Sequence, residues 1–546
     1  MFKRISKDRK VTKESFMKGI LVLMFSQVLI KLLGLVYKLY LTNKEGFGDT
    51  GNAIYNSGYQ IYALLLTISS VGVPNAISKL ISERVAIGDN KGAYRIFKIS
   101  LITFGIIGAI GTSILFFGAN YLANNLLMIP EAELTLVALS PSVFFVTIAS
   151  VFRGYFNARE KISVTAKSQT LEQVFKTVLT VIVVEIVTIA SGLNTTLMAA
   201  GANLATTLSV LLSFGYLFLY YRIYKKDITV DIVTSVNYKK ESIKSTIKKI
   251  LWVSIPISLS AITSSLNKNI DSFTVVRLLS EFMSEAQAKI QYGILSGKVD
   301  TLITLPLSFN VAFATALVPA ISSSIAKNDI ETVNKRISFS VLLTILIGMP
   351  CTFGMMIFAD PIIRLLFPNA TDGAFLLQLS ALAIIFTLLI QTCNGALQGL
   401  GKVYIPAIAG VVGLIIKLIL NVVLIRIPSI GINGAAIASI IYHIFALVIV
   451  LYVLIKTIKI KFNINKYVVK PIVATIGMCV CSYYLYTILN NFIAFKFAII
   501  ISLICAVLIY CIMVIILKIF TKEEIYMIPY GQKLYQVLET IGVYKK

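Results

Sequence analysis

The sequence predicts an all-α polytopic membrane protein of about fourteen transmembrane helices: two parallel six-helix repeats plus two extra C-terminal helices. Three observations predict this fold class. Hydrophobic residues make up 57% of the 546 residues and charged residues 14%, a balance that soluble domains do not reach. The apolar residues fall in runs long enough to cross a hydrocarbon core of roughly 30 Å. Lysine and arginine collect in alternate connections between these runs, as the positive-inside rule requires.

The fourteen apolar runs are predicted to be the membrane spans. They lie near 17–41, 53–80, 96–122, 132–157, 167–190, 195–221, 249–275, 292–325, 337–358, 373–399, 404–425, 433–455, 467–489 and 494–519. If the N-terminus is cytoplasmic, the inside segments carry 36 basic residues and the outside segments 6. This bias predicts that both termini are cytoplasmic. The basic N-terminus precedes an apolar run too long for a signal-peptide core, so we interpret that run as a retained helix.

The chain matches itself when it is shifted by 241 residues. The aligned pairs include Phe145 with Phe386, Gly154 with Gly395, Lys176 with Lys417 and, with small gaps, Asp89 with Asp329. Six spans per half is an even number, so the two repeats are predicted to be parallel, which places a substrate site between them. The predicted domains are 1–225 (N-terminal six-helix bundle), 226–248 (basic cytoplasmic linker), 249–460 (C-terminal six-helix bundle) and 461–546 (two extra helices and a cytoplasmic tail).

The sequence offers few residues of the types that bind metals or catalyse reactions. The net charge of +25 would indicate nucleic acid in a soluble protein, but here the cytoplasmic loops account for most of it. The six cysteines lie in apolar runs without zinc-ligand spacing, and His443 is the single histidine. We therefore expect no enzyme activity, no metal, no cofactor and no nucleic-acid partner.

The run 17–41 contains two lysines that hydropathy alone does not explain. Lys31 and Lys38 are seven residues apart, so they lie on one helical face two turns apart, with Gly34 between them. A cation near the bilayer centre costs at least about 2.5–3.5 kcal/mol, and such residues usually face a protein interior or a wet cavity. One interpretation is that the long side chains reach the interface. The other is that this face lines a cavity for an anion.

Other predicted spans also carry polar and charged candidates. They are Lys298 and Asp300 in the eighth span, Asn269 and Asp271 in the seventh, Lys176 in the fifth and Lys417 in the eleventh. For Lys176, a structural ion pair with Glu172 at i, i+4 is an alternative to cavity lining. For Lys176 and Lys417 together, equivalent helix-packing roles are a further alternative.

The sign of these charges points to an anionic substrate. An exporter of cationic drugs needs buried carboxylates, whereas the first and eighth spans offer Lys31, Lys38 and Lys298 with only Asp300 nearby. Lysine is a compact point charge suited to phosphate oxygens. Several lysines in one cavity would therefore suit a phosphate or pyrophosphate.

Several motifs resemble a known family. The stretch 26–38 (SQVLIKLLGLVYK), residues 269–271 (NID), and the stretch from 296–298 (SGK) through 305–308 (LPLS) to 314–322 (ATALVPAIS) are similar to lipid II flippases of the MurJ type. The nearest branch resembles the SpoVB-type polysaccharide-export proteins of the multidrug/oligosaccharidyl-lipid/polysaccharide exporter superfamily. The resemblance covers nearly the whole chain. Tyr37-Lys38 stands where the MurJ signature has Arg-Asp, a departure that favours the SpoVB branch.

The resemblance implies a flippase for an undecaprenyl-pyrophosphate-linked sugar in the bacterial plasma membrane. It implies that Lys31 and Lys298 correspond to arginines that bind the pyrophosphate, and that the last two helices form a groove for the lipid tail. The expected partners are the lipid-linked substrate and the bilayer, with cell-wall synthases as a candidate class, and the expected state is a monomer. Three alternatives stay open: a cation-coupled multidrug exporter, an enzyme acting on lipid-linked sugars, and a scaffold for cell-wall synthases.

Overall fold

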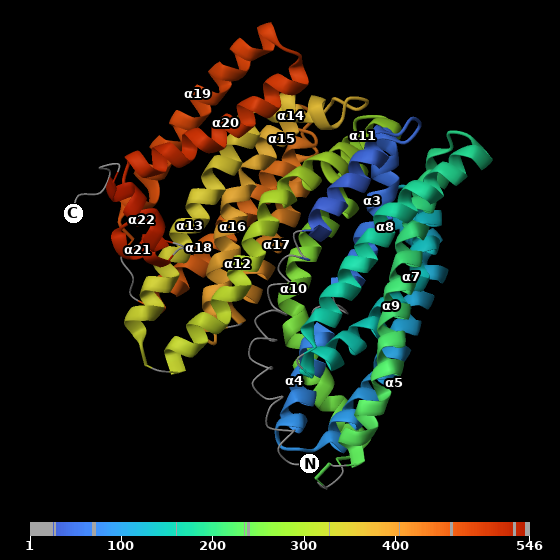
Figure 1. Cartoon of the computed structure of the whole chain (residues 1–546). Coiled ribbons are helices and arrows are strands. Elements are labelled where there is room, and N and C mark those ends of the chain that lie inside the picture. Colours follow the sequence, from blue (N-terminus) through green and yellow to red (C-terminus); the bar gives the residue numbers. More distant parts are fainter. Residues whose placement is uncertain are drawn as a thin grey trace. The chain divides into compact units, whose positions relative to one another are not determined.

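The structure is a computed structural model. It describes residues 26, 29–67, 72–159, 161–233, 235–236, 241–326, 328–402, 404–458, 462–527 and 531–540. Every regular element in these ranges is a helix, which confirms the all-α class (Figure 1). Ten stretches of the described residues are long and apolar enough to span a membrane. These are Asn90–Phe117, Ala132–Ala158, Ile162–Ser191, Thr195–Lys225, Ile330–Ile357, Ala374–Gly399, Tyr404–Leu424, Asn433–Ile458, Asn465–Phe492 and Phe495–Ile516.

The count of fourteen spans stays a prediction, and residues 17–25, 27 and 28 of the first predicted span lie outside the described ranges. The described residues of the predicted spans at 53–80, 249–275 and 292–325 are helical, but these spans are not among the ten. Residues 68–71 of the run 53–80 lie outside the described ranges, between a helix that ends at Thr67 and one that begins at Val73. Helices of this kind bury polar side chains such as Asn52, Asn56 and Asn269 inside the protein. Polar residues at membrane depth are tolerated where they are buried inside the protein. They lower the mean hydropathy of the helix, so the helix is harder to recognise as a membrane span.

The described residues form two compact units. The first compact unit comprises Met1–Thr301 with Leu418–Ala435. Its elements are a first helix (residues 29–43), α3 (Gly48–Thr67), α4 (Val73–Ala86), α5 (Asn90–Phe117), α6 (Ala119–Tyr121), η2 (Leu122–Leu126), α7 (Ala132–Ala158), α8 (Ile162–Ser191), α9 (Thr195–Val233), α10 (Ile243–Leu279), α11 (Glu285–Gly293) and η3 (Ile294–Val299). The two η elements are π-helical turns.

The second compact unit comprises Leu302–Lys417 with Ala436–Lys546. Its elements are α12 (Asp300–Ala326), α13 (Ile330–Ile357), α14 (Ala359–Leu366), α15 (Ala374–Ala381), α16 (Ala383–Gly399), α17 (Tyr404–Leu424), α18 (Asn433–Ile458), η4 (Asn465–Val469), α19 (Lys470–Phe492), α20 (Phe495–Ile516), α21 (Lys522–Met527) and α22 (Gly531–Thr540). The first residues of α12 and α18 and the last residues of α17 belong to the first unit.

The compact units do not divide the chain at the predicted 226–248 linker. Helix α10 packs on α3 and α4, and α11 packs on α3, so the start of the predicted second half folds with the first half. Helix α9 continues into the predicted linker as far as Val233. The predicted domain limits describe repeats rather than packing, and they stay a prediction.

Two pairs of residues from the predicted duplication occupy equivalent local structures. Asp89 and Asp329 each cap the helix that follows, with side-chain oxygens accepting from Gly92 N at 2.8 Å and Thr332 N at 3.0 Å. An N-cap of this type stabilises a helix by about 1 kcal/mol. Gly154 and Gly395 each permit a close helix approach: an added Cβ would lie 2.8 Å from Pro74 O and 2.6 Å from Ala314 O. Matching helix caps and matching close helix contacts at equivalent positions are expected if the two halves arose by duplication.

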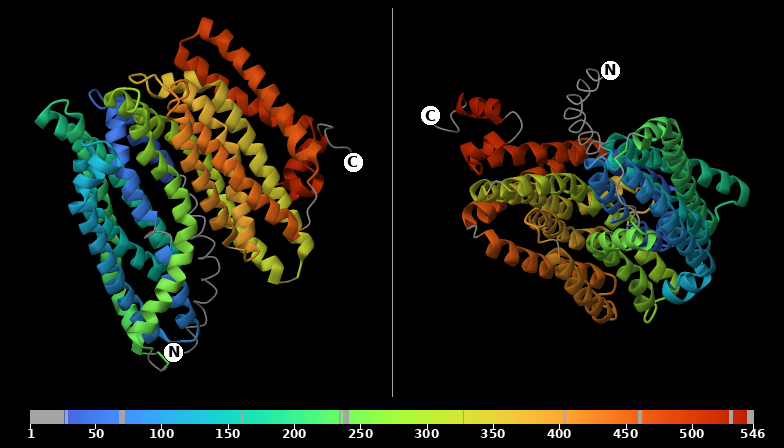
Figure 2. Two further views of the ribbon diagram at one scale, coloured as in Figure 1. Left: turned by 180° about the vertical axis from the view of Figure 1, so that it is seen from behind. Right: turned by 90° about the horizontal axis from the view of Figure 1, so that it is seen from below.

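The C-terminal helices α19 and α20 lie side by side, and α19 packs against α13 (Figures 1 and 2). The predicted tail after α20 contains two short helices, α21 and α22. Ile525, Tyr535 and Leu538 bury their side chains there against Ile515 and Phe520. Helices α21 and α22 therefore pack against the last turn of α20 and the residues just after it.

Candidate functional site

The first helix carries the two candidate lysines on one side and a buried tyrosine on another. Lys31 is exposed, Lys38 is half-buried, and Tyr37 is buried. Lys38 Nζ donates a hydrogen bond to Thr301 Oγ1 at 3.0 Å. Lys38 therefore lies beside the start of α12 within the first unit, and its role in a substrate site stays a prediction.

Two further charges meet where Lys268 of α10 approaches Asp300, the first residue of α12. Lys268 Nζ is 3.5 Å from Asp300 Oδ2, and both side chains are partly exposed. Lys38 contacts Thr301, the residue next to Asp300, so Lys38 and Lys268 both lie at the start of α12, and Lys31 lies two helical turns before Lys38. We name Lys31, Lys38, Lys268 and Asp300 the lysine cluster. The cluster carries three positive charges and one negative charge, and its side chains are partly exposed. An anionic group that reached it would neutralise the excess positive charge. Sequence analysis singled out Lys31, Lys38 and Asp300 as site candidates, and the structure adds Lys268 beside Asp300.

Lys298 is in a different environment from the lysine cluster. Its Nζ lies 2.8 Å from Asp49 Oδ2, and the exposed fractions of the two side chains are 0% and 10%. The contact joins η3 to the first turn of α3. Lys298 is thus engaged with a carboxylate in this conformation, and sequence analysis did not identify Asp49 as its partner.

Close backbone packing explains how Asp49 and Lys298 meet. Gly293 and Gly297 are four residues apart, the small-xxx-small spacing that lets helices approach closely. A side chain on Gly293 would overlap the backbone oxygen of Asp49, and one on Gly297 would overlap the side chain of Asn52. This glycine spacing is the sequence signal that could have placed α3 against η3.

The predicted residues of α10 make local polar contacts. Asn269 is fully buried, and its Nδ2 donates to Ser265 O at 2.9 Å. Asp271 Oδ1 accepts a hydrogen bond from Asn421 Nδ2 at 2.9 Å. This contact ties the end of α17 to α10 within the first unit.

The predicted alternative of a Glu172–Lys176 ion pair is wrong. Glu172 Oε2 lies 2.7 Å from Arg153 Nη2 on α7, because that guanidinium is buried beside it and needs a counter-charge. Lys176 Nζ instead lies over two aromatic rings, 5.0 Å from the centroid of Tyr37 and 4.1 Å from that of Tyr59.

The two remaining candidates are placed as follows. Lys417 is fully buried in the second unit, one turn after Gly413, where α17 lies against the ring of Tyr442. Gly34 lies opposite α8, and an added Cβ would be 3.8 Å from Gln173 Nε2. That distance is an ordinary van der Waals contact, so close packing does not require a glycine at this position.

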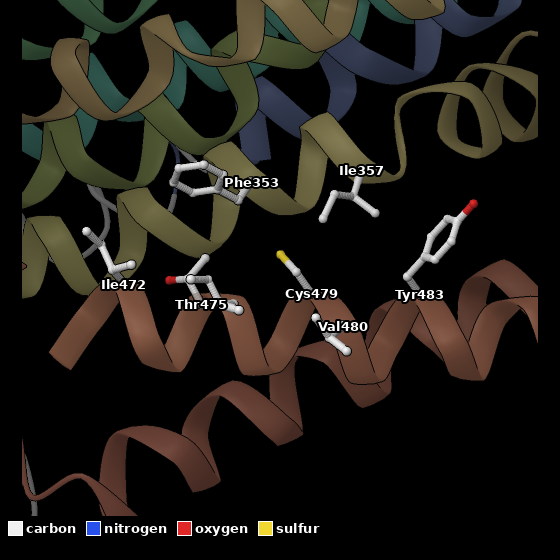
Figure 3. A pocket seen from close by; sticks show the side chains of 8 residues that line it. Phe353, Ile357, Ile472, Thr475, Cys479, Val480 and Tyr483 are labelled. Atoms are coloured by element: carbon white, nitrogen blue, oxygen red, sulfur yellow. The ribbon is translucent and has the colours of Figure 1, made fainter. Parts of the chain in front are cut away.

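A mostly apolar groove lies between α13 and α19 in the second unit (Figure 3). Its volume is about 680 Å³, within the usual range of ligand pockets. It is lined by Phe353, Ile357, Ile472, Thr475, Ile476, Cys479, Val480 and Tyr483. Among the described residues, no group of three or more His, Cys, Asp or Glu side chains could hold a metal ion.

Two family models match the chain. The model described as polysaccharide biosynthesis protein matches residues 16–325, and the MatE model matches residues 256–423. Stage V sporulation protein B of Bacillus subtilis is 27% identical over 526 residues, covering 95% of this chain and 98% of that protein. The lipid II flippase MurJ of Bacillus subtilis is 24% identical over 445 residues, covering 79% of this chain and 81% of that protein.

A solved structure has the same fold. The structure titled lipid II flippase MurJ, inward closed conformation, superposes with a TM-score of 0.68 at 17% identity. The superposition covers 90% of this chain and 98% of that chain.

Proposed function

The chain belongs to the polysaccharide biosynthesis protein family of the multidrug/oligosaccharidyl-lipid/polysaccharide exporter superfamily, and on this premise we propose that it flips an undecaprenyl-pyrophosphate-linked sugar from the inner to the outer leaflet. Members of this superfamily move substrates and do not convert them. The substrate is lipid II or a related cell-wall or polysaccharide precursor. The protein acts as a monomer in the bacterial plasma membrane.

The observation that carries the proposal is the lysine cluster. Lys38 and Lys268 contact Thr301 and Asp300 at the start of α12, and Lys31 lies two helical turns before Lys38 on the same face of the first helix. Cations inside apolar helices are costly unless they face a wet or protein-lined cavity. A pyrophosphate brings the negative charge that this cluster lacks. The sugar head group would follow this polar route while the polyprenyl tail stays in lipid.

Lys298 enters the site in a second step. Its ammonium is paired with Asp49 and has no exposed surface in this conformation. It can contribute to pyrophosphate binding only after the contact between α3 and η3 opens. Lys298 is then a second binding position for the pyrophosphate, which agrees with an alternating-access mechanism.

The groove between α13 and α19 supports a lipid-linked substrate. It is mostly apolar, and its lining includes Phe353 of α13 and Tyr483 of α19 (Figure 3). A polyprenyl tail beside the protein is already in an apolar medium, so van der Waals packing and shape, not transfer from water, would hold it in this groove at the lipid-facing side of the protein. We assign the groove to that tail.

The second candidate function is a cation-coupled multidrug exporter, which the MatE match to residues 256–423 favours. The two functions depend on opposite charges. In an exporter of cations, Asp271 and Asp300 would be essential and the lysines dispensable. Complementation of a strain depleted of its lipid II flippase separates them: growth supports lipid II transport, whereas drug resistance without growth supports the exporter.

Lys38→Ala is expected to reduce flipping roughly ten- to a hundredfold, because a hydrogen bond to a charged group contributes about 1.5–3 kcal/mol. Arginine at this position should retain more activity than glutamine, since charge is the requirement. The measurement is the accessibility of lipid-linked precursor at the outer leaflet, in cells with matched protein levels. Lys167→Ala, an exposed lysine on α8, serves as the control. Normal flipping by Lys38→Ala would remove the lysine cluster from the substrate path.

The charge bias of 36 to 6 predicts the orientation of the chain. In a variant whose native cysteines are replaced, single cysteines at Thr50 and Asp372 should react with an impermeant thiol reagent added outside the cell. A cysteine at position 240, outside the described residues, should react only after the membrane is opened. Reaction of position 240 in intact cells would contradict cytoplasmic termini.

A further inference from the structure

The first helix rests on α8 along most of its described length. Thr177 Oγ1 donates to Leu33 O at 3.2 Å, and Lys44, the residue just after the helix, pairs through Nζ with Glu185 at 2.7 Å. Between these two contacts, Lys176 lies over the ring of Tyr37. The face of the helix that carries Tyr37 is therefore fixed against α8.

Lys176 joins three helices through aromatic rings. Its ammonium lies 4.1 Å from the ring centroid of Tyr59 on α3 and 5.0 Å from that of Tyr37 on the first helix. The Tyr59 ring stacks on Tyr55 at 5.7 Å, and Tyr55 Oη donates to Tyr37 Oη at 3.5 Å. Lys176, Tyr37, Tyr55 and Tyr59 thus form a closed ring of contacts, which we call the tyrosine clamp.

The environment of Lys176 differs from that of a substrate ligand. Its exposed fraction is 5%, and the carboxylate one turn before it, Glu172, is engaged with Arg153. Ring faces attract a cation through the aromatic quadrupole, most strongly where water is excluded. The tyrosine clamp therefore supplies the electrostatic partner that holds the ammonium inside the helix bundle.

Fixing Tyr37 also fixes its neighbour. Consecutive residues of an α-helix point about 100° apart around the axis, so the direction of Tyr37 sets the direction of Lys38. Lys38 reaches Thr301 from this setting. We infer that Lys176 is a positioning residue, which holds the first helix through the tyrosine clamp so that Lys38 faces the anion site. The inference rests on the proposed function for the role of Lys38, but the position of the helix can be measured separately.

The test combines a distance with a binding constant. Spin labels at Val36 and Val178, both exposed positions, report the distance between the first helix and α8 in a variant whose native cysteines are replaced. Affinity for undecaprenyl pyrophosphate is measured in nanodiscs. Lys176→Met should broaden the distance distribution and weaken binding roughly tenfold, because the variant loses the cation–π contacts of a desolvated ammonium. Lys176→Arg should preserve both, and the exposed Lys167→Met should change neither.

The outcomes separate the inference from the proposed function. In one outcome, Lys176→Met broadens the distances between the two spin labels, but neither Lys176→Met nor Lys38→Met changes the affinity for undecaprenyl pyrophosphate. The tyrosine clamp is then upheld and the proposed function fails. If the distances are unchanged in Lys176→Met, the positioning role is wrong. If Lys176→Met weakens binding by the same factor in a Lys38→Met background, Lys176 contacts the ligand directly and the inference is also wrong.

A second pair of variants covers the case in which Lys176→Met does not fold. Tyr59→Phe keeps the ring beneath the ammonium, whereas Tyr59→Leu removes it. The inference expects narrow distances and normal binding in Tyr59→Phe, and broadened distances with weaker binding in Tyr59→Leu. Equal behaviour of the two variants would overturn it.

Discussion

Lys298→Met is expected to lower the free energy of unfolding by about 3–5 kcal/mol, because it removes the ammonium from a buried ion pair and leaves Asp49 charged. Asp49→Asn should be destabilising for the converse reason. The double variant Lys298→Met/Asp49→Asn removes both charges and should recover most of the loss. Thermal unfolding of the purified proteins in detergent measures these differences.

The same double variant tests the role of Lys298 in transport. If Lys298 is a second binding position for the pyrophosphate, the double variant should be folded but deficient in flipping. If it flips normally, Lys298 serves only as the partner of Asp49. Asp360→Asn, which breaks the exposed pair with Arg364, is the control and should cost less than about 1 kcal/mol.

Hydropathy predicted the helices that face lipid better than those that line the interior. Helix α20 (Phe495–Ile516) is apolar around most of its surface, so composition identifies it as a span. Helix α3 buries Asn52, Asn56 and Gln60 within the protein, which lowers its hydropathy although it packs at the centre of the first unit. The division into fold units was also not predictable, because α10 packs on α3 across a sequence separation of some two hundred residues.

The parts of the candidate site that depend on residues close together in the sequence were predictable. Lys31 and Lys38 stand out because two cations interrupt one apolar run. The partners of Lys298 and Glu172 did not, because they lie far away in the sequence: Asp49 belongs to α3 and Arg153 to α7. The spacing of Glu172 and Lys176 pointed to a pair on one helix. Tertiary packing overrode that preference, since the buried guanidinium of Arg153 needs a carboxylate more than a lysine beside two tyrosine rings does.

Glu172→Leu is expected to lower the free energy of unfolding by about 3–5 kcal/mol, because it leaves Arg153 as a buried cation. The exposed fraction of the Arg153 side chain is 5% and that of Glu172 is 23%. The guanidinium of Arg153 also donates hydrogen bonds to two neutral hydroxyl groups, Ser168 Oγ at 3.1 Å and Ser213 Oγ at 3.2 Å. Two hydroxyl groups accept hydrogen bonds but do not neutralise the charge.

The unequal exposure of the two partners predicts an unequal cost. Arg153→Met leaves a carboxylate that water partly reaches, so its charge remains partly solvated. Glu172→Leu should therefore destabilise the protein more than Arg153→Met does, and the double variant Glu172→Leu/Arg153→Met should be more stable than Glu172→Leu alone. Glu331→Leu, which breaks the exposed pair with Lys335, is the matched control and should cost less than about 1 kcal/mol. Thermal unfolding of the four purified variants in detergent measures the order, and equal losses for Glu172→Leu and Glu331→Leu would show that the pair with Arg153 contributes no more than a surface contact.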